Sequence, residues 1–337
     1  MGTAGIPRRA PLWVGRRQLL VGSAALLSML GAGAAPAAAP ARVGFVSGLD
    51  EGGSAEFLGA MRGGLAALGY REPETLQLTT RYANFDLQRL PSLVAELEAL
   101  SVQVIVSHAT AVPIVVRAPR RVPVVYEFSA DPVATGIARD LRHPLFNATG
   151  MSLLRAELNS KRLELLHEIA PDIRRVAVIF NPLHPGEALE LADIQAKATQ
   201  LGIYLALYPT PNRTELDRAL ATIADNPPQA IVAFSEGFVV ENRATLVEFA
   251  MRRGLPLISG WAVMAKAGAL FTYGPRLVDT YARTAYFVDR ILKGATPAEL
   301  PIEEPSVLEL VVNMKSARAL GLSIPETVLA RADQIIE

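Results

Sequence analysis

The sequence predicts an α/β fold with two similar lobes, each a parallel β-sheet flanked by helices, joined by a hinge that the chain crosses several times. Three observations support this. One order of strand and helix patterns occurs twice along the chain. Most predicted strands are apolar without alternation, as strands covered on both faces are. The chain has 337 residues, enough for two domains of about 130–150 residues each.

Residues 1–41 differ in composition from the rest. They contain four arginines and no acidic residue, then an apolar stretch from Leu19 to about Ala35 and small residues at 37–41. This pattern predicts a secretory signal peptide cleaved near residues 37–41, and hence a periplasmic protein. Arg16-Arg17 resembles a twin-arginine export signal, although ordinary leaders also carry paired arginines. An uncleaved membrane anchor is the alternative.

The first lobe begins at Arg42 and is predicted to comprise residues 42–149 plus 274–305. Apolar residues at helical spacing predict helices over 53–68 and 87–100. Residues 143–150 have no periodicity, and we expect them to cross to the second lobe. The strands are predicted over 42–48, 76–82, 102–107 and 122–126.

The second lobe is predicted to comprise residues 150–273 plus 306–337. It starts with an amphipathic helix over 160–169, which Pro171 ends. Residues 271–275 are expected to cross back, and Lys293-Gly294 is a typical end for a long helix over 277–292. The tail 315–337 predicts short helices around Pro325. The strands are predicted over 175–182, 203–208, 230–235, 255–259 and 309–313.

Charge and cysteine content exclude several kinds of partner. Without the four arginines of the leader, 29 basic residues face 33 acidic ones, a net charge of −4. This balance argues against nucleic acid and anionic membranes as partners. The chain has no cysteine, which excludes disulfides, thiolate catalysis, Cys-ligated metals and a lipid-modified cysteine. We expect a freely diffusing monomer.

The candidate binding residues lie in loops after predicted strands. Ligands of open parallel sheets bind beyond the carboxyl ends of the strands, where loops and helix N-termini meet. Most of these loops begin with a small hydroxyl, an amide or a glycine. They could form a polar cleft or be only caps and turns. The candidates are Ser47, Ser107, His108, Thr110, Ser129, Asp131, Asn181, Ser235, Glu236, Phe238, Gly260, Trp261 and Tyr273.

These residue types suggest roles toward a small zwitterion. Hydroxyls and backbone N–H groups at Ser107, Thr110, Ser129 and Ser235 could hold a carboxylate. Asp131 or Glu236 could take an amine, and Trp261 or Phe238 could flank an apolar group. Alternatively, Asp131 caps the turn at Pro132, Glu236 is solvated and the aromatic residues belong to the core. Glu127 could be a member of a buried ion pair.

Signals for an enzyme are weak. The four histidines have no metal-ligand spacing, and the sequence has neither a Gly-x-Ser-x-Gly elbow nor a phosphate loop. The glycines of 48–53 suggest a dinucleotide turn, but Asp50 and Glu51 would repel a pyrophosphate. We therefore predict no catalytic residue, no metal and no cofactor.

Several segments together resemble a known family. They include Arg89-Leu90-Pro91, Val104-Ile105-Val106-Ser107, Asp131-Pro132-Val133, Asn147-Ala148-Thr149-Gly150, Asn181-Pro182, Tyr273-Gly274-Pro275 and Asn313-Met314-Lys315. In this order they resemble the substrate-binding proteins of ABC importers, in the subgroup with tryptophan- and tyrosine-type binding proteins. The resemblance covers essentially all of the chain after the leader.

The resemblance implies a type I periplasmic binding protein with two Rossmann-like lobes that close on a small solute. It implies delivery to a permease and an ATPase, with no chemistry on the solute, which would be an amino acid or a similar compound, aromatic or branched. The chain departs from the family at His108 and Ala109-Thr110, where Gly-Thr is common, and at Glu127, where an apolar residue is usual. A periplasmic ligand sensor for a membrane receptor and an exported α/β enzyme are the alternatives.

Overall fold

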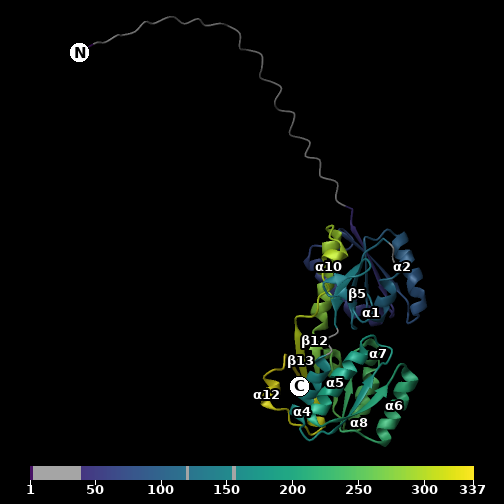
Figure 1. Ribbon diagram of the computed structural model, residues 1–337, viewed down its shortest axis with the longest axis vertical. Coiled ribbons are helices and arrows are strands. Elements are labelled where there is room, and N and C mark those ends of the chain that lie inside the picture. Colours follow the sequence, from purple (N-terminus) through teal and green to yellow (C-terminus); the bar gives the residue numbers. More distant parts are fainter. Residues whose placement is uncertain (3–38, 119–120, 154–156) are drawn as a thin grey trace. The chain divides into compact units, whose positions relative to one another are not determined.

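Two mainly parallel sheets organise residues Pro40–Glu337, which form one unit of the computed structural model (Figure 1). The structure describes residues 1–2, 39–118, 121–153 and 157–337. The predicted signal peptide lies outside the described residues, apart from its first two and last three positions. We call each sheet with the helices packed on it a lobe.

The first lobe is built on a five-stranded parallel sheet with the order β2-β1-β3-β4-β7. Its strands are β1 (Ala41–Ser47), β2 (Leu76–Tyr82), β3 (Val104–His108), β4 (Val124–Phe128) and β7 (Ala148–Ser152), with a small hairpin of β5 (Ala138–Asp140) and β6 (His143–Pro144). Its helices are α1 (Glu51–Ala67), η1 (Leu87–Arg89), α2 (Leu90–Ala99), η2 (Ala109–Ala111), α3 (Val112–Val115), α10 (Leu277–Leu292) and η3 (Pro297–Glu299).

The second lobe is built on a seven-stranded sheet with the order β14-β13-β12-β11-β10-β8-β9, in which only the β12–β13 pair is antiparallel. Its strands are β8 (Arg175–Phe180), β9 (Tyr204–Pro209), β10 (Ala230–Ala233), β11 (Leu257–Ser259), β12 (Phe271–Pro275), β13 (Leu308–Asn313) and β14 (Gln334–Ile336). Its helices are α4 (Glu157–Ile169), α5 (Glu187–Leu201), α6 (Arg213–Asp225), α7 (Gly237–Glu241), α8 (Arg243–Arg252), α9 (Ala262–Ala267), α11 (Met314–Ala319) and α12 (Glu326–Leu329).

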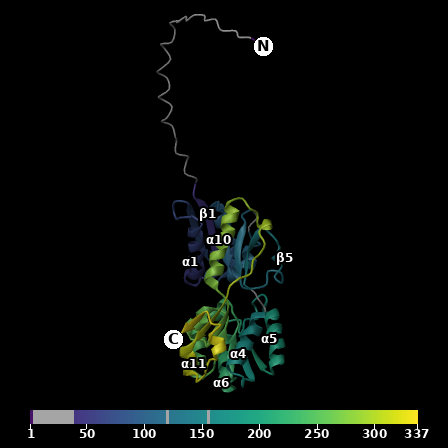
Figure 2. The same cartoon turned by 90° about the vertical axis from the view of Figure 1, so that its left-hand side faces the viewer.

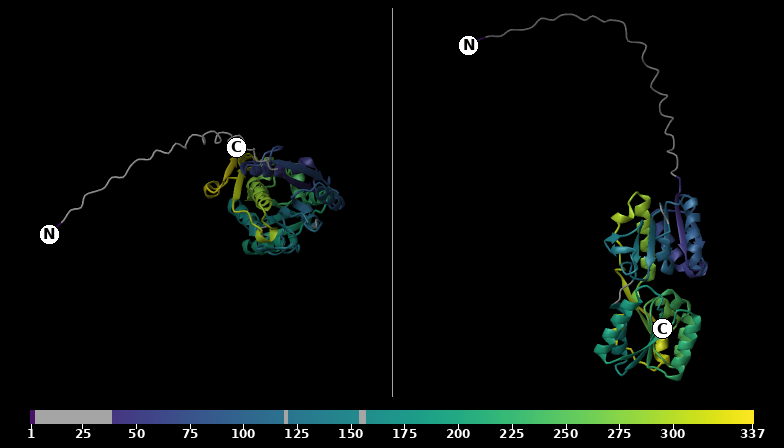
Figure 3. Two further views of the ribbon diagram at one scale, coloured as in Figure 1. Left: turned by 90° about the horizontal axis from the view of Figure 1, so that it is seen from above. Right: turned by 45° about the vertical axis from the view of Figure 1, so that its right-hand side comes forward.

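The repeat predicted from the sequence is present as a repeat of topology. The first five strands of each main sheet, counted in chain order, lie side by side in the order second, first, third, fourth, fifth. Helices cover both faces of each sheet (Figure 3), which buries the central strands completely. The predicted α/β class with two parallel-sheet lobes is confirmed, while the residue bounds of the two lobes stay a prediction.

Helix α10 belongs to the first lobe although it follows the first five strands of the second. Figure 2 shows it beside α1. Its Phe287 and Val288 share a buried cluster with Phe57 and Met61 of α1. The two helices approach closely at Gly64, where an added Cβ would lie 2.6 Å from the carbonyl oxygen of Ala282. A late segment of the chain thus completes the core of the first lobe.

The structure contains the predicted helices, and capping residues lie at their ends. Asp50 accepts a hydrogen bond from the Gly53 N–H at the start of α1. Gly294 has φ +98° just after α10, where the backbone must leave the helix. The N-terminal bounds of α1 and α4 lie two or three residues earlier than expected, since first-turn residues there carry little apolar signal.

Two segments expected only to cross between lobes are strands, and so is part of the tail. β7 and β12 are the fifth strands of their sheets, and the chain leaves each lobe from them. β7 includes Ala148, Gly150 and Ser152, which have low strand propensity, and all five of its residues are buried. At Gly150 a Cβ would lie 1.9 Å from the carbonyl oxygen of Tyr126. β14 was missed because it has only three residues.

The crossing segments are hydrogen-bonded to one another. Met151, at the end of the first lobe's sheet, forms a parallel bridge with Glu303. The Ser152 N–H donates to the Glu303 carbonyl at 2.9 Å, and the Arg276 N–H donates to the Val307 carbonyl at 3.2 Å. These contacts tie the described crossing segments to one another. Among the described residues, none of the helices is both long and apolar enough to cross a bilayer.

The close approach at Gly64 gives a matched test of the α1–α10 packing. Gly63→Ala should stabilise the protein by up to about 1 kcal/mol, because alanine favours a helix and its Cβ meets nothing within 4 Å. Gly64→Ala gains the same helix propensity but must displace α10, so we expect a net loss of about 1–3 kcal/mol. Urea unfolding of the two variants measures the difference. Equal stabilities would contradict the described packing.

Candidate functional site

A cavity of about 200 Å³ lies where the carboxyl ends of strands from both lobes meet. The first lobe contributes residues from α1, from the ends of β3 and β4, and from α10, while the second contributes residues from α7, α8 and α9. The lining residues are Leu49, Gly52, Gly53, Glu56, Phe57, His108, Ala109, Glu127, Ser129, Gly237, Val240, Glu241, Arg243, Trp261, Val263, Leu277 and Tyr281. The position agrees with the rule for open parallel sheets.

The first-lobe wall contains a stack of aromatic rings. The rings of Phe57 and His108 are stacked with centroids 4.6 Å apart, and Phe57 meets Tyr281 edge-on at 4.9 Å. Behind this stack, His108 Nε2 lies 3.0 Å from the Ser47 hydroxyl, to which Ser54 donates at 2.8 Å. Burial lowers the pKa of His108 to about 4, so its ring is neutral at physiological pH. This wall is flat, aromatic and without positive charge.

Glu127 is the most unusual residue of the cavity. Its side chain is 2% exposed, and it follows three apolar residues of β4. The Ala109 N–H donates to its carboxylate, but no ion pair of the described residues includes it. Burial raises the pKa of Glu127 to about 8, because a charge is poorly solvated there. Glu127 is therefore largely protonated at neutral pH.

The second-lobe wall combines apolar side chains with charges at its edge. Trp261 is 8% exposed and forms the N-terminal boundary of α9, while Val240 of α7 and Val263 of α9 also face the cavity. Glu241 and Arg243 line the same side. Burial and the nearby Asp50 raise the pKa of Glu241. This wall offers an indole, aliphatic groups and one guanidinium to a solute.

A buried polar cluster in the second lobe supports this wall. The Arg162 Nε donates to the Tyr273 carbonyl at 2.8 Å, and its guanidinium also bonds Asn159. A Cβ at Gly260 would lie 2.0 Å from the Ser235 hydroxyl and 2.2 Å from Arg162 Nη2. Only glycine therefore fits between Arg162 and the start of α9. The sequence analysis singled out Gly260 and Ser235 but not Arg162.

A side-chain hydrogen bond joins the two lobes beside the cavity. The Ser129 hydroxyl, after β4, lies 3.2 Å from Nε2 of His184, in the loop after β8. Nδ1 of His184 is 3.8 Å from Glu190 Oε2. Burial lowers the pKa of His184 to about 4, so the ring is neutral near pH 7.

The structure brings three of the predicted site residues to the cavity surface: His108, Ser129 and Trp261. Three others lie in loops of the second lobe. Glu236 is 2% exposed and accepts hydrogen bonds from the Phe238 and Val239 N–H groups at 2.9 Å, which makes it the N-cap of α7. It is buried rather than solvated. Asn181 caps its own turn at Leu183, and the Ser235 hydroxyl is buried without a partner.

The remaining candidates do not line the cavity. Ser47 and Ser107 are buried below it, Thr110 is exposed, and Phe238 packs on the second-lobe core. Asp131 accepts a hydrogen bond from the Val133 N–H at 2.7 Å and so caps the turn at Pro132. Tyr273 lines a separate depression. The binding roles of all thirteen residues stay predictions.

The sequence analysis missed cavity residues that lie within helices. Glu56, Phe57, Leu277 and Tyr281 come from α1 and α10. Apolar periodicity marks Phe57, Leu277 and Tyr281 only as packing residues, and Glu56 reads as a solvated helix residue. Glu127 carried a signal, because a carboxylate at the end of an apolar strand is unusual. Arg243 carried none.

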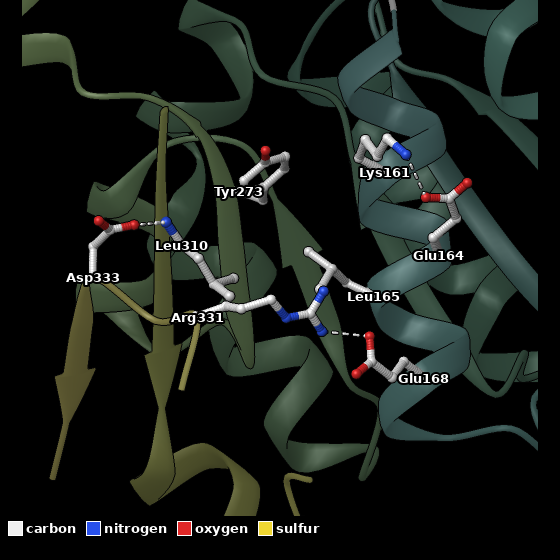
Figure 4. Close-up of a pocket in the computed structure, with 8 residues that line it drawn as sticks. All are labelled: Lys161, Glu164, Leu165, Glu168, Tyr273, Leu310, Arg331 and Asp333. Atoms are coloured by element: carbon white, nitrogen blue, oxygen red, sulfur yellow. Dashed lines mark hydrogen bonds and ion pairs between the residues drawn. The ribbon is translucent and has the colours of Figure 1, made fainter. Parts of the chain in front are cut away.

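A depression of about 320 Å³ lies in the second lobe, between α4 and the segments around β12 to β14. Figure 4 shows its charged rim, in which Lys161 pairs with Glu164 at 2.9 Å and Arg331 pairs with Glu168 at 2.5 Å. These charged side chains already pair with one another, and the depression lies away from the strand ends. We therefore regard it as a surface groove. In the described part of the chain, no cluster of His, Asp and Glu could hold a metal.

Comparisons with known proteins identify relatives. The model of the ABC transporter substrate binding protein family matches residues 43–336. The tyrosine-binding protein of Clostridioides difficile (strain R20291) is 18% identical over 267 residues, which cover 78% of this chain and 76% of that protein.

Two solved structures have closely similar folds. The ABC domain in complex with L-Trp from Streptococcus pneumonia has a TM-score of 0.80 at 22% identity and covers 88% of this chain and 100% of its own. A conserved domain protein from Vibrio cholerae O1 biovar eltor has a TM-score of 0.79 at 25% identity and covers 88% and 99%. The chain thus has a periplasmic-binding-protein-type fold.

The raised pKa of Glu127 makes a prediction about stability. Between pH 4.5 and 8 the unfolded chain releases this proton while the folded protein keeps it, so Glu127 lowers stability as the pH rises. Below pH 4.5 both states are protonated and the effect is absent. Glu127→Gln should therefore unfold like the wild type near pH 4 and be more stable at pH 8, by roughly 2–4 kcal/mol.

Denaturant titrations across this pH range measure the effect, with Glu74→Gln as an exposed control that should change stability little. A gain for Glu127→Gln that does not depend on pH would show that the pKa is not raised.

Proposed function

The chain belongs to the ABC transporter substrate-binding protein family, and from this premise we propose that it captures an amino acid, aromatic in type, in the cavity between its lobes. The family is one of binding proteins, not of enzymes. The observation that carries the proposal is the cavity itself, since both lobes line it at the carboxyl ends of their strands.

The cavity walls suit an aromatic solute. Trp261 on one side and the Phe57–His108 stack on the other provide flat apolar surfaces for a ring. Relatives named for tyrosine binding and solved with L-Trp agree with this choice. We propose that His108, Ser129 and Trp261 contact the solute, and that Arg243 holds its carboxylate.

A solute that touches both lobes favours the arrangement in which they lie together. We propose that the protein is exported to the periplasm and acts there as a monomer. Its solute-bound form would then be recognised by a permease and its ATPase. A dissociation constant of about 1 µM corresponds to roughly −8 kcal/mol. One buried aromatic ring and a few charge-assisted hydrogen bonds can supply this.

The cavity contains a natural fluorescent probe. The chain has two tryptophans, Trp13 in the leader and Trp261 in the cavity. In full-length protein with Trp13→Phe, we expect tyrosine, phenylalanine or another amino acid without an indole to change the Trp261 emission in a saturable way. The same solute should raise the melting temperature, because a solute at 100 times its dissociation constant stabilises the folded state by about 2.7 kcal/mol.

A panel of amino acids that changes neither signal would contradict the amino-acid assignment. Trp261→Ala should weaken binding by roughly 10–30-fold in calorimetry, because it removes one wall of the cavity. Tyr204→Ala is the control, since Tyr204 is an exposed aromatic residue (66%) on β9 of the same lobe and should leave binding unchanged.

A further inference from the structure

The distribution of charge in the cavity narrows the class of solute. Two carboxylates, Glu56 and Glu127, face the cavity from the first lobe. No Lys or Arg of that lobe is among its lining residues. Arg243, which donates to the Val240 carbonyl at 2.8 Å, approaches from the second lobe instead. The first-lobe wall therefore carries two acidic groups and no cation, and the opposite wall carries the guanidinium of Arg243 beside the carboxyl group of Glu241.

Glu127 is a buried residue of this wall, not a surface charge. Its side chain is 2% exposed. Within the described residues, its carboxyl group accepts a hydrogen bond from one backbone N–H and forms no ion pair. Its neighbours across the sheet are His108 of β3 and Met151 of β7. Ionisation of a buried carboxyl group with a single donor is costly, which keeps Glu127 protonated in the free protein. A cation bound beside it would stabilise the ionised form.

The groups around Glu127 suit an ammonium group. Tyr281 of α10 and Phe57 of α1 present aromatic surfaces on the same side, and both Glu127 and Glu56 act electrostatically on Tyr281. A cation near a carboxylate is further stabilised by aromatic faces. His108, neutral in this wall, brings no competing charge.

On the basis of the proposed function, we propose that the solute carries a protonated nitrogen and that Glu127 is the residue that selects for it. The ammonium group would lie against the first-lobe wall, between Glu127 and the Tyr281 and Phe57 rings. The solute class is then organic ammonium compounds, which include amino acids but exclude aromatic acids that lack an amine.

The test compares three probes that share one ring. L-Tryptophan has both charges, tryptamine lacks the carboxylate and indolepropionate lacks the ammonium. Calorimetry on the full chain should detect tryptophan and tryptamine, while indolepropionate should bind at least tenfold more weakly. Because Glu127 must ionise on binding, close to one proton per solute should be released at pH 7, measured in buffers of different ionisation enthalpy.

Variants identify the residue responsible. Glu127→Gln keeps the shape of the side chain and should lose at least tenfold in affinity for tryptophan and tryptamine, together with the proton release. Glu74→Gln, an exposed carboxylate outside the cavity, should bind like the wild type. Circular dichroism and the melting temperature establish first that Glu127→Gln is folded.

The outcomes separate this inference from the proposed function. If tryptophan and indolepropionate bind alike, or if Glu127→Gln binds and releases protons like the wild type, the inference is wrong and the binding role stands. If amines bind but no amino acid does, the amino-acid assignment is wrong and the inference is supported. If none of the amines or amino acids binds, both are wrong.

Discussion

The hydrogen bonding between the crossing segments is the constraint on which the site depends. Met151 pairs with Glu303 and Arg276 with Val307, so the described parts of the crossing segments are tied to one another. Since β7 and β12 enter it directly from their sheets, the carboxyl ends of both sheets are held toward one cavity. A single flexible linker would leave each set of strand-end loops exposed to water, with no second wall for a solute.

The buried carboxyl groups near this cavity differ in how many hydrogen-bond donors and cations they have as partners. This difference determines which of them is available to a solute. Glu236 receives two N–H donors at the start of α7, and Glu190 lies near Arg162 and accepts from Asn159. Burial still raises the pKa of both to about 7. Glu127 has a single donor, and its pKa rises further. The first two carboxylates have structural partners, whereas Glu127 faces the space that a solute would fill.

The sequence predicted the architecture well because its signals were local and repeated. Apolar strands, helix ends such as Lys293-Gly294 and the duplicated order of elements all describe short segments. The fifth strands were less visible, because β7 consists mainly of small residues and lacks the apolar run that marks the central strands. The site was predicted in part. Strand-end loops pointed to His108, Ser129 and Trp261, but Tyr281 and Phe57 reach the cavity from helices whose role depends on long-range packing, which one sequence does not encode locally.

The position of α10 has a consequence for how the chain acquires its structure. The first lobe takes Ala285, Phe287, Val288, Ile291 and Leu300 into a buried cluster whose other members lie between Val43 and Met151. During synthesis from the N-terminus, this core therefore stays open until nearly the whole second lobe has been made. Contacts so distant along the chain slow folding, because a long loop must close before they form. The two lobes have the same topology, yet the core of the first lobe is completed only after most of the second lobe has been synthesised.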